Sequence, residues 1–137
     1  MTLYYAYGAN TNLDSMRYRC PKATLLGGFT LPDWRLVFKG VADIEVAPHN
    51  KVMGVLWEIT PDCEISLDRF EGYPHLYRKE FFPVLMKDKT VVDVMFYKMN
   101  REGYARPSQQ YFQTIEDGYH QNKLPTDLLW NSLEECT

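Results

Sequence analysis

The sequence contains little cysteine and histidine and has no long hydrophobic run. Its three cysteines, Cys20, Cys63 and Cys136, are odd in number and far apart, a spacing that fits reduced thiols and neither a disulfide framework nor a zinc site. The three histidines stand alone, with no second ligand at helical or turn spacing, so we expect no metal. The apolar runs are much shorter than a membrane span, and no signal-like segment opens the chain. We therefore expect a cytoplasmic protein that does not enter a membrane.

Positive charge is also scarce. The chain carries 15 Lys and Arg against 18 Asp and Glu, a net charge of −3 at pH 7. Its densest basic cluster, formed by Arg17, Arg19 and Lys22, is too small for a nucleic-acid surface. No glycine-rich phosphate loop follows a predicted strand, and the sequence has no Gly-X-Ser-X-Gly elbow. The sequence thus predicts no nucleic-acid partner and no cofactor.

Aromatic residues are abundant by contrast. They make up 15% of the chain, and ten of them are tyrosines, which suits a pocket as well as an ordinary core. Because no repeat or linker interrupts the sequence, we expect residues 1–137 to form one domain. The pattern predicts an α+β fold, in which a small, mostly antiparallel β-barrel, closed or nearly closed, is flanked by two to four helices. Predicted strands cover residues 3–7, 23–31, 34–39, 51–59, 77–86 and 90–99, and predicted helices cover residues 12–20, 61–71, 108–121 and 126–134.

The segment Tyr7-Gly8-Ala9-Asn10 follows directly on the first apolar run. Gly8 allows the backbone to turn with positive φ or to approach a ligand closely. Successive N–H groups in such a turn can form a concave nest for an anion. The alternative is an ordinary turn after a strand.

Glu71 is the candidate catalytic residue. At about 100° per residue, it lies roughly 80° from Cys63, on the shoulder of the apolar stripe of the predicted helix over residues 61–71. The carboxyl end of a helix disfavours a carboxylate and is expected to raise the pKa of Glu71, which suits a general base and acid near neutral pH. The alternative is a solvated acidic flank, in which Glu64, Asp68 and Glu71 face Arg69, Arg78 and Lys79.

Three blocks of the sequence resemble the γ-glutamylcyclotransferase family. Tyr7-Gly8-Ala9-Asn10 resembles the family's Tyr-Gly-Ser-Asn loop, with Ala9 where serine is usual. The segment Leu67-Asp68-Arg69-Phe70-Glu71-Gly72, with Tyr77-Arg78 after it, resembles the Leu-Asp-X-Phe-Glu-Gly block ahead of a Tyr-X strand. Pro107-Ser108 with Tyr111, then Gly118 and Leu124-Pro125, is similar to the family's Pro-Ser-X-X-Tyr helix and its exit. The blocks occur in the family's order and span nearly the whole chain.

The resemblance implies a small β-barrel flanked by helices, with a cavity at its mouth. It implies that Glu71 is the catalytic acid and base and that residues 7–10 bind a glutamyl moiety, chiefly through backbone groups. Tyr111 would line the same cavity, and Tyr77 is expected beside Glu71. If the loop acts through N–H donors, the serine hydroxyl missing at Ala9 matters little; if that hydroxyl held substrate, affinity or substrate choice has changed.

The implied reaction cyclises a γ-glutamyl amide to 5-oxoproline and frees an amine. It needs no metal, cofactor or covalent intermediate, and its partner is a small γ-glutamyl substrate. The resemblance leaves open whether the protein is a monomer or a homodimer. The alternative to an enzyme is a binding module, in which the same pocket sequesters or senses a small metabolite.

Overall fold

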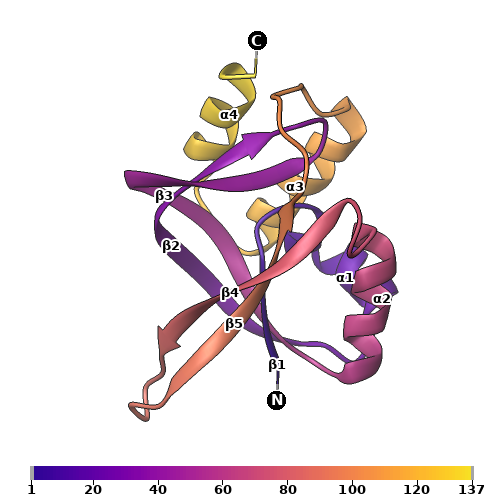
Figure 1. Cartoon of the computed structure of the whole chain (residues 1–137), viewed down its shortest axis with the longest axis vertical. Coiled ribbons are helices and arrows are strands. Elements are labelled where there is room, and N and C mark those ends of the chain that lie inside the picture. The colour runs from indigo at the N-terminus through magenta and orange to yellow at the C-terminus, as the bar shows by residue number, and fades with distance from the viewer. Residues whose placement is uncertain (1, 137) are drawn as a thin grey trace.

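A five-stranded sheet organises the chain, whose computed structural model describes residues 2–136. The order of the strands is β2-β3-β1-β5-β4, and Figure 1 shows α1 and α2 on one side of the sheet and α3 and α4 toward another. The strands are β1 (Thr2–Ala6), β2 (Thr24–Phe38), β3 (Ala42–Ile59), β4 (Tyr77–Leu85) and β5 (Val91–Met99). The helices are the 3-10 turn η1 (Ala9–Thr11), α1 (Leu13–Arg19), α2 (Pro61–Glu71), α3 (Gln109–Gln121) and α4 (Asp127–Glu134).

Strand β1 is the centre of the sheet. It pairs antiparallel with β3 and parallel with β5. Leu3 and Tyr5 belong to one hydrophobic core, whereas Tyr4 and Ala6 belong to another. Side chains of a strand alternate between the two faces of a sheet. Residues 3–6 of β1 are therefore apolar or aromatic at every position, because both faces of the strand are buried there.

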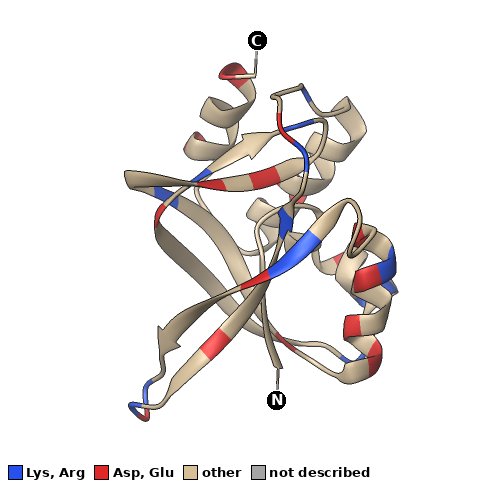
Figure 2. Ribbon diagram, viewed as in Figure 1, with Lys and Arg blue, Asp and Glu red and all other residues tan. Residues whose placement is uncertain are grey.

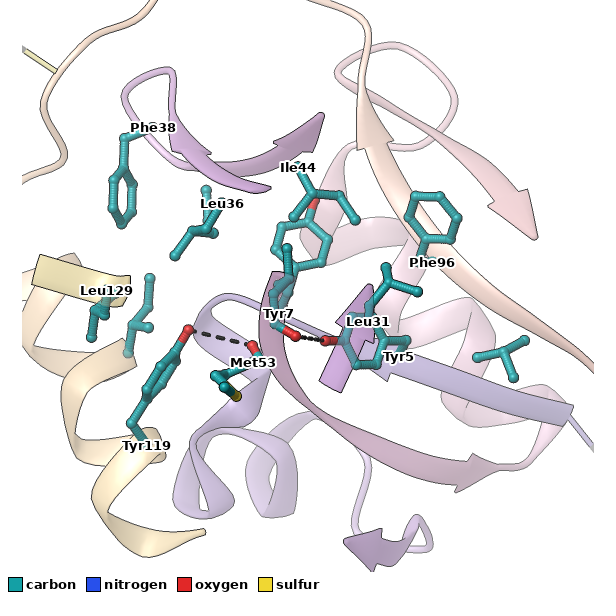
Figure 3. Packing of buried hydrophobic residues seen from close by; sticks show 14 of the residues in the cluster. Tyr5, Tyr7, Leu31, Leu36, Phe38, Ile44, Met53, Phe96, Tyr119 and Leu129 are labelled. Carbon is teal, nitrogen blue, oxygen red and sulfur yellow. Dashed lines mark hydrogen bonds between the residues drawn. The ribbon is translucent and has the colours of Figure 1, made fainter. Parts of the chain in front are cut away.

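The larger core lies between the sheet and the helices α3 and α4 (Figure 3). Its aromatic side chains are tied to the backbone: the Tyr119 hydroxyl donates to the Met53 carbonyl at 3.3 Å, and the Tyr5 hydroxyl donates to the Val52 carbonyl at 3.0 Å. Buried hydroxyls need such partners. The smaller core packs the helices α1 and α2 against the sheet through Met16, Cys63, Leu67, Trp57, Met95 and Met99.

The α+β class and the mostly antiparallel sheet are confirmed, but the sheet does not close into a barrel. Within residues 2–136, β2 and β4 form its two edges and are not hydrogen-bonded to each other. Side chains bridge the gap instead, because the rings of Phe29 on β2 and Phe82 on β4 are stacked with their centres 6.1 Å apart.

Most predicted elements occur, with two corrections to the strands. The predicted strands over residues 23–31 and 34–39 are one strand, β2, which continues past Pro32 through a shift of register against β3. Asp33, at that shift, has a φ of 66°. Strand β3 begins at Ala42, nine residues before the predicted strand over residues 51–59. A bulge lets a long strand absorb a proline without ending.

The expectation of reduced thiols is wrong for two of the three cysteines. Cys20 and Cys63 form a disulfide, with their Cα atoms 5.0 Å apart, and only Cys136 is free. The bond joins the residue after α1 to the first turn of α2. Sequence spacing missed it because the two cysteines are 43 residues apart and meet only after folding.

Figure 2 shows acidic and basic residues interspersed over the strands and helices. Within residues 2–136, every helix is too short or too polar to span a membrane.

Candidate active site

A small cavity opens where six segments of the chain meet. Its wall contains six tyrosines and a single ionisable acid, Glu71. The strand β1 and the residues after it, the first residue of β3, the end of α2, the start of β4, β5 and the first turn of α3 all contribute. The lining residues are Tyr4, Tyr5, Tyr7, Gly8, Ala42, Glu71, Tyr77, Tyr97 and Tyr111.

Helix α2 places Glu71 at the cavity. The helix begins after Thr60, whose hydroxyl accepts a hydrogen bond from the N–H of Cys63 at 3.2 Å. The fully buried Leu67 fixes its orientation in the smaller core. Gly72 ends the helix with a φ of 66°, a left-handed conformation that favours glycine. Glu71 is therefore the last helical residue.

Burial raises the pKa of Glu71 from its ordinary value of 4.5 to about 7, and the charge of Arg19 opposes this shift. The upward direction agrees with the sequence-based expectation, and its largest cause is the loss of solvation on burial. No hydrogen bond or ion pair joins the Glu71 carboxyl group to another residue within residues 2–136. Among residues 2–136 the Glu71 carboxyl group thus has no bonded partner, and its pKa lies near neutral pH.

The neighbouring acids on α2 are engaged elsewhere. The Lys79 ammonium lies 2.6 Å from a carboxylate oxygen of Glu64 and 2.9 Å from one of Asp68. Asp68 also accepts a 2.7 Å hydrogen bond from the hydroxyl of Tyr97. The acidic flank expected as the alternative thus exists for Glu64 and Asp68, whereas Glu71 lies outside it and faces the cavity.

Four of the six tyrosines in the cavity wall donate their hydroxyl hydrogen to the protein. Tyr7 donates to the Tyr97 carbonyl at 2.6 Å and Tyr77 to the Ala42 carbonyl at 2.7 Å. Tyr97 donates to Asp68, and Tyr5 to backbone carbonyls. These bonds hold the rings in place but leave their hydroxyls no hydrogen to give to a ligand.

Tyr4 and Tyr111 differ because their hydroxyl oxygens accept hydrogen bonds. Tyr4 accepts one from the side-chain amide of Asn10 at 3.0 Å, and Tyr111 accepts one from the N–H of Ala42 at 3.0 Å. In the described part of the chain, neither O–H has an acceptor. Burial raises the pKa of both phenols. Each is therefore a neutral donor available to a ligand.

Gly8 lines the cavity without the positive φ that the sequence allowed. Its φ is −122°, so the need for glycine comes from close packing. A Cβ at this position would lie 3.1 Å from the Cβ of Ala42 and 3.4 Å from the hydroxyl of Tyr111. The N–H groups of Gly8, Ala9 and Asn10 have no acceptor among residues 2–136.

Ala9 and Asn10 do not line the cavity. Ala9 is buried in η1. The Asn10 side chain donates a hydrogen bond to the Tyr4 hydroxyl and accepts one from Arg19 at 2.8 Å. The backbone carbonyl of Asn10 accepts a 3.1 Å hydrogen bond from the Trp57 indole. Asn10 therefore supports the wall from behind.

The structure brings five of the seven predicted site residues to one cavity: Tyr7, Gly8, Glu71, Tyr77 and Tyr111. The sequence reasoning missed Tyr4, Tyr5, Ala42 and Tyr97. The aromatic density of β1 signals the first two. Ala42 carries no chemical signal, since it contributes through its backbone.

The fold and the site define a class of small α+β proteins with one buried carboxyl group in a tyrosine-lined cavity, and comparisons identify its family. The sequence profile of the AIG2-like family matches residues 51–131, which include Glu71, Tyr77 and Tyr111. The chain therefore belongs to the AIG2-like family.

Gamma-glutamylcyclotransferases are similar to this chain in sequence and in structure. Gamma-glutamylcyclotransferase from Bos taurus is 28% identical over 138 aligned positions, which cover 91% of this chain and 73% of that protein. The Homo sapiens protein of the same name is 29% identical with the same coverage. A solved structure of a gamma-glutamyl cyclotransferase superposes with a TM-score of 0.82 at 26% identity, covering 99% of this chain and 88% of that one. These comparisons confirm the resemblance carried by the three sequence blocks.

Proposed function

We propose that this protein is an enzyme of the γ-glutamylcyclotransferase type, which converts a γ-glutamyl amide into 5-oxoproline and a free amine. The observation that carries the proposal is Glu71, a carboxyl group with a pKa of about 7 and no bonded partner within residues 2–136, at the cavity of a chain from this family. A general base works best with a pKa near the operating pH.

The reaction needs one group that takes up and returns a proton. The α-amine of the glutamyl group attacks its own γ-carbonyl carbon, and a new C–N bond closes a five-membered ring. Glu71 accepts the proton that this amine loses and delivers one to the departing nitrogen as the original amide C–N bond breaks. Proton transfer of this kind contributes about 10²- to 10⁴-fold in rate.

The cavity wall supplies the remaining functions. Negative charge develops on the γ-carbonyl oxygen during the attack, and donors fixed in advance stabilise it. Tyr4 and Tyr111 are such donors, and the N–H group of Gly8, the one residue among Gly8, Ala9 and Asn10 that lines the cavity, offers a place for the α-carboxylate. The small cavity favours a folded-back substrate, in which amine and carbonyl already lie close together.

The test is a panel of γ-glutamyl amines and γ-glutamyl amino acids incubated with the protein and analysed by mass spectrometry. We expect 5-oxoproline to accumulate in equal amount with one released amine. The Glu64→Gln variant serves as a matched control, since Glu64 lies on the same helix but binds Lys79. A compound that binds tightly and is recovered unchanged, with no 5-oxoproline from any member of the panel, would instead identify a binding module.

A further inference from the structure

Arg19 lies behind the cavity wall and is held in one orientation by two contacts. Its guanidinium donates a 2.8 Å hydrogen bond to the side-chain oxygen of Asn10. The carbon of the guanidinium lies 3.4 Å from the centre of the Phe70 ring, a cation–π contact. Phe70 directly precedes Glu71, so the charge of Arg19 is anchored beside the end of α2.

The backbone of Arg19 is fixed to the same helix. The Ser66 hydroxyl donates a 2.8 Å hydrogen bond to the Arg19 carbonyl. The next residue, Cys20, is bonded to Cys63. Ser66 and Cys63 both belong to α2. A hydrogen bond and a disulfide therefore join the end of α1 to the helix that carries Glu71.

We propose that Arg19 is a positioning residue for the reaction: its guanidinium, held by Asn10 and Phe70, places a fixed positive charge beside the end of α2, where it favours the carboxylate form of Glu71 that accepts a proton. Arg19 does not line the cavity and so acts through Glu71 and not on the substrate. The proposal rests on the proposed function for its role in turnover, but the effect of the charge on Glu71 exists without any substrate.

Arg19 is the charged residue that favours the ionised form of Glu71. Lys79, a second cation beside α2, is neutralised by Glu64 and Asp68. Burial raises the pKa of the Glu71 carboxyl and so favours its neutral form, and the charge of Arg19 acts in the opposite direction. Five tyrosine hydroxyls from β1, the residue after it, β4, β5 and α3 interact electrostatically with Glu71. Burial raises the pKa of each, so all five are neutral at neutral pH: Tyr4, Tyr7, Tyr77, Tyr97 and Tyr111.

The test compares Arg19→Met, Arg19→Gln and Arg19→Lys with the wild type. The control is Arg17→Met, because Arg17 lies on the same helix with a side chain that is 76% exposed and pairs with Asp14. The pKa of Glu71 is measured by carboxyl ¹³C NMR of the substrate-free protein, with the Glu71 signal assigned by its loss in Glu71→Gln. The pH profile of kcat/KM is measured alongside.

Removing the charge should raise the titration midpoint of Glu71 by roughly one unit, the lower end for an opposite charge nearby. The acid limb of kcat/KM should move by the same amount, which is a roughly tenfold loss below the midpoint, while the rate at high pH recovers. Arg19→Lys and Arg17→Met should titrate like the wild type. If Arg19→Met fails to fold, the comparison of Arg19→Gln with Arg19→Lys decides.

An unchanged midpoint in both uncharged variants, or an equal shift in Arg19→Lys and Arg19→Gln, would overturn the proposal. A shifted midpoint in a protein that forms no 5-oxoproline would refute the proposed function and leave the electrostatic assignment standing. The two failures are therefore separable.

Discussion

The N–H of Ala42 donates a 3.0 Å hydrogen bond to the hydroxyl of Tyr111. The carbonyl of the same alanine accepts the 2.7 Å bond of Tyr77. One residue at the start of β3 thus holds tyrosines from α3 and β4 on the cavity wall. Because Tyr111 uses only its oxygen in this contact, its hydrogen is left for a ligand.

Replacing Tyr111 with phenylalanine removes that donor without changing the ring. We expect kcat/KM to fall roughly 10²-fold, in line with the loss of one donor to a developing oxyanion. The control is Tyr119→Phe on the same helix, whose hydroxyl bonds to the Met53 carbonyl in the core, away from the cavity wall. Both variants should lose about 1 kcal/mol of stability, but only Tyr111→Phe should lose activity. Equal activity in the two variants would show that Tyr111 is structural.

Glu71→Gln separates proton transfer from binding. The amide keeps the size of the side chain and its hydrogen-bonding capacity but cannot exchange a proton. Turnover should therefore fall by at least about 10²-fold while substrate affinity changes far less. Steady-state kinetics and calorimetric titration of the substrate measure the two effects. If the variant turns over like the wild type, the assignment of Glu71 is wrong, and Asp68 becomes the next residue to replace.

The pH dependence of stability should also reveal the raised pKa of Glu71. The pKa of this group is about 7 in the folded state against an ordinary 4.5, so the folded protein binds more protons than the unfolded chain between these values. Stability must then fall as the pH rises through this window, by at most on the order of 3 kcal/mol. Glu71→Gln should lack this fall and be the more stable protein at pH 8. Urea unfolding of both proteins from pH 4 to pH 8 makes the comparison, and parallel curves would contradict the burial of the carboxyl group.

The parts of the structure that could be predicted from the sequence are those set by neighbouring residues in the chain. The bounds of α2 follow from the cap at Thr60 and the stop at Gly72, both of which are adjacent in sequence to what they control. The parallel pairing of β1 with β5 and the disulfide depend on residues brought together only by folding. The pKa of Glu71 shows the same limit: its direction followed from position on the helix, but its main cause, burial, required the surrounding strands.

The disulfide predicts a stability difference that depends on reductant. Cys20 and Cys63 close a loop of 43 residues, and such a bond typically stabilises by about 2–4 kcal/mol. Wild-type protein should therefore unfold at lower urea when a reductant is present, and Cys136→Ser should behave in the same way, since Cys136 is free. The urea midpoint of a Cys20→Ser, Cys63→Ser double variant should not change with reductant. A wild-type midpoint that is also unchanged would support reduced thiols, as the sequence spacing predicts.

Ala9 stands where the Tyr-Gly-Ser-Asn loop that residues 7–10 resemble has serine, and its buried position predicts a small effect of introducing a hydroxyl there. Ala9 is 8% exposed and does not line the cavity, so a hydroxyl there should not meet the substrate. Ala9→Ser should keep kcat/KM within a few fold and lose about 1–3 kcal/mol of stability if the new hydroxyl finds no partner. Gly8→Ala is the contrasting variant, because its Cβ would lie 3.1 Å from Ala42 and 3.4 Å from the Tyr111 hydroxyl. That change should lower kcat/KM by up to about 10²-fold, since small displacements at a reacting centre are costly. A tenfold gain in Ala9→Ser would show instead that this loop binds substrate through a hydroxyl and that Ala9 has altered substrate choice.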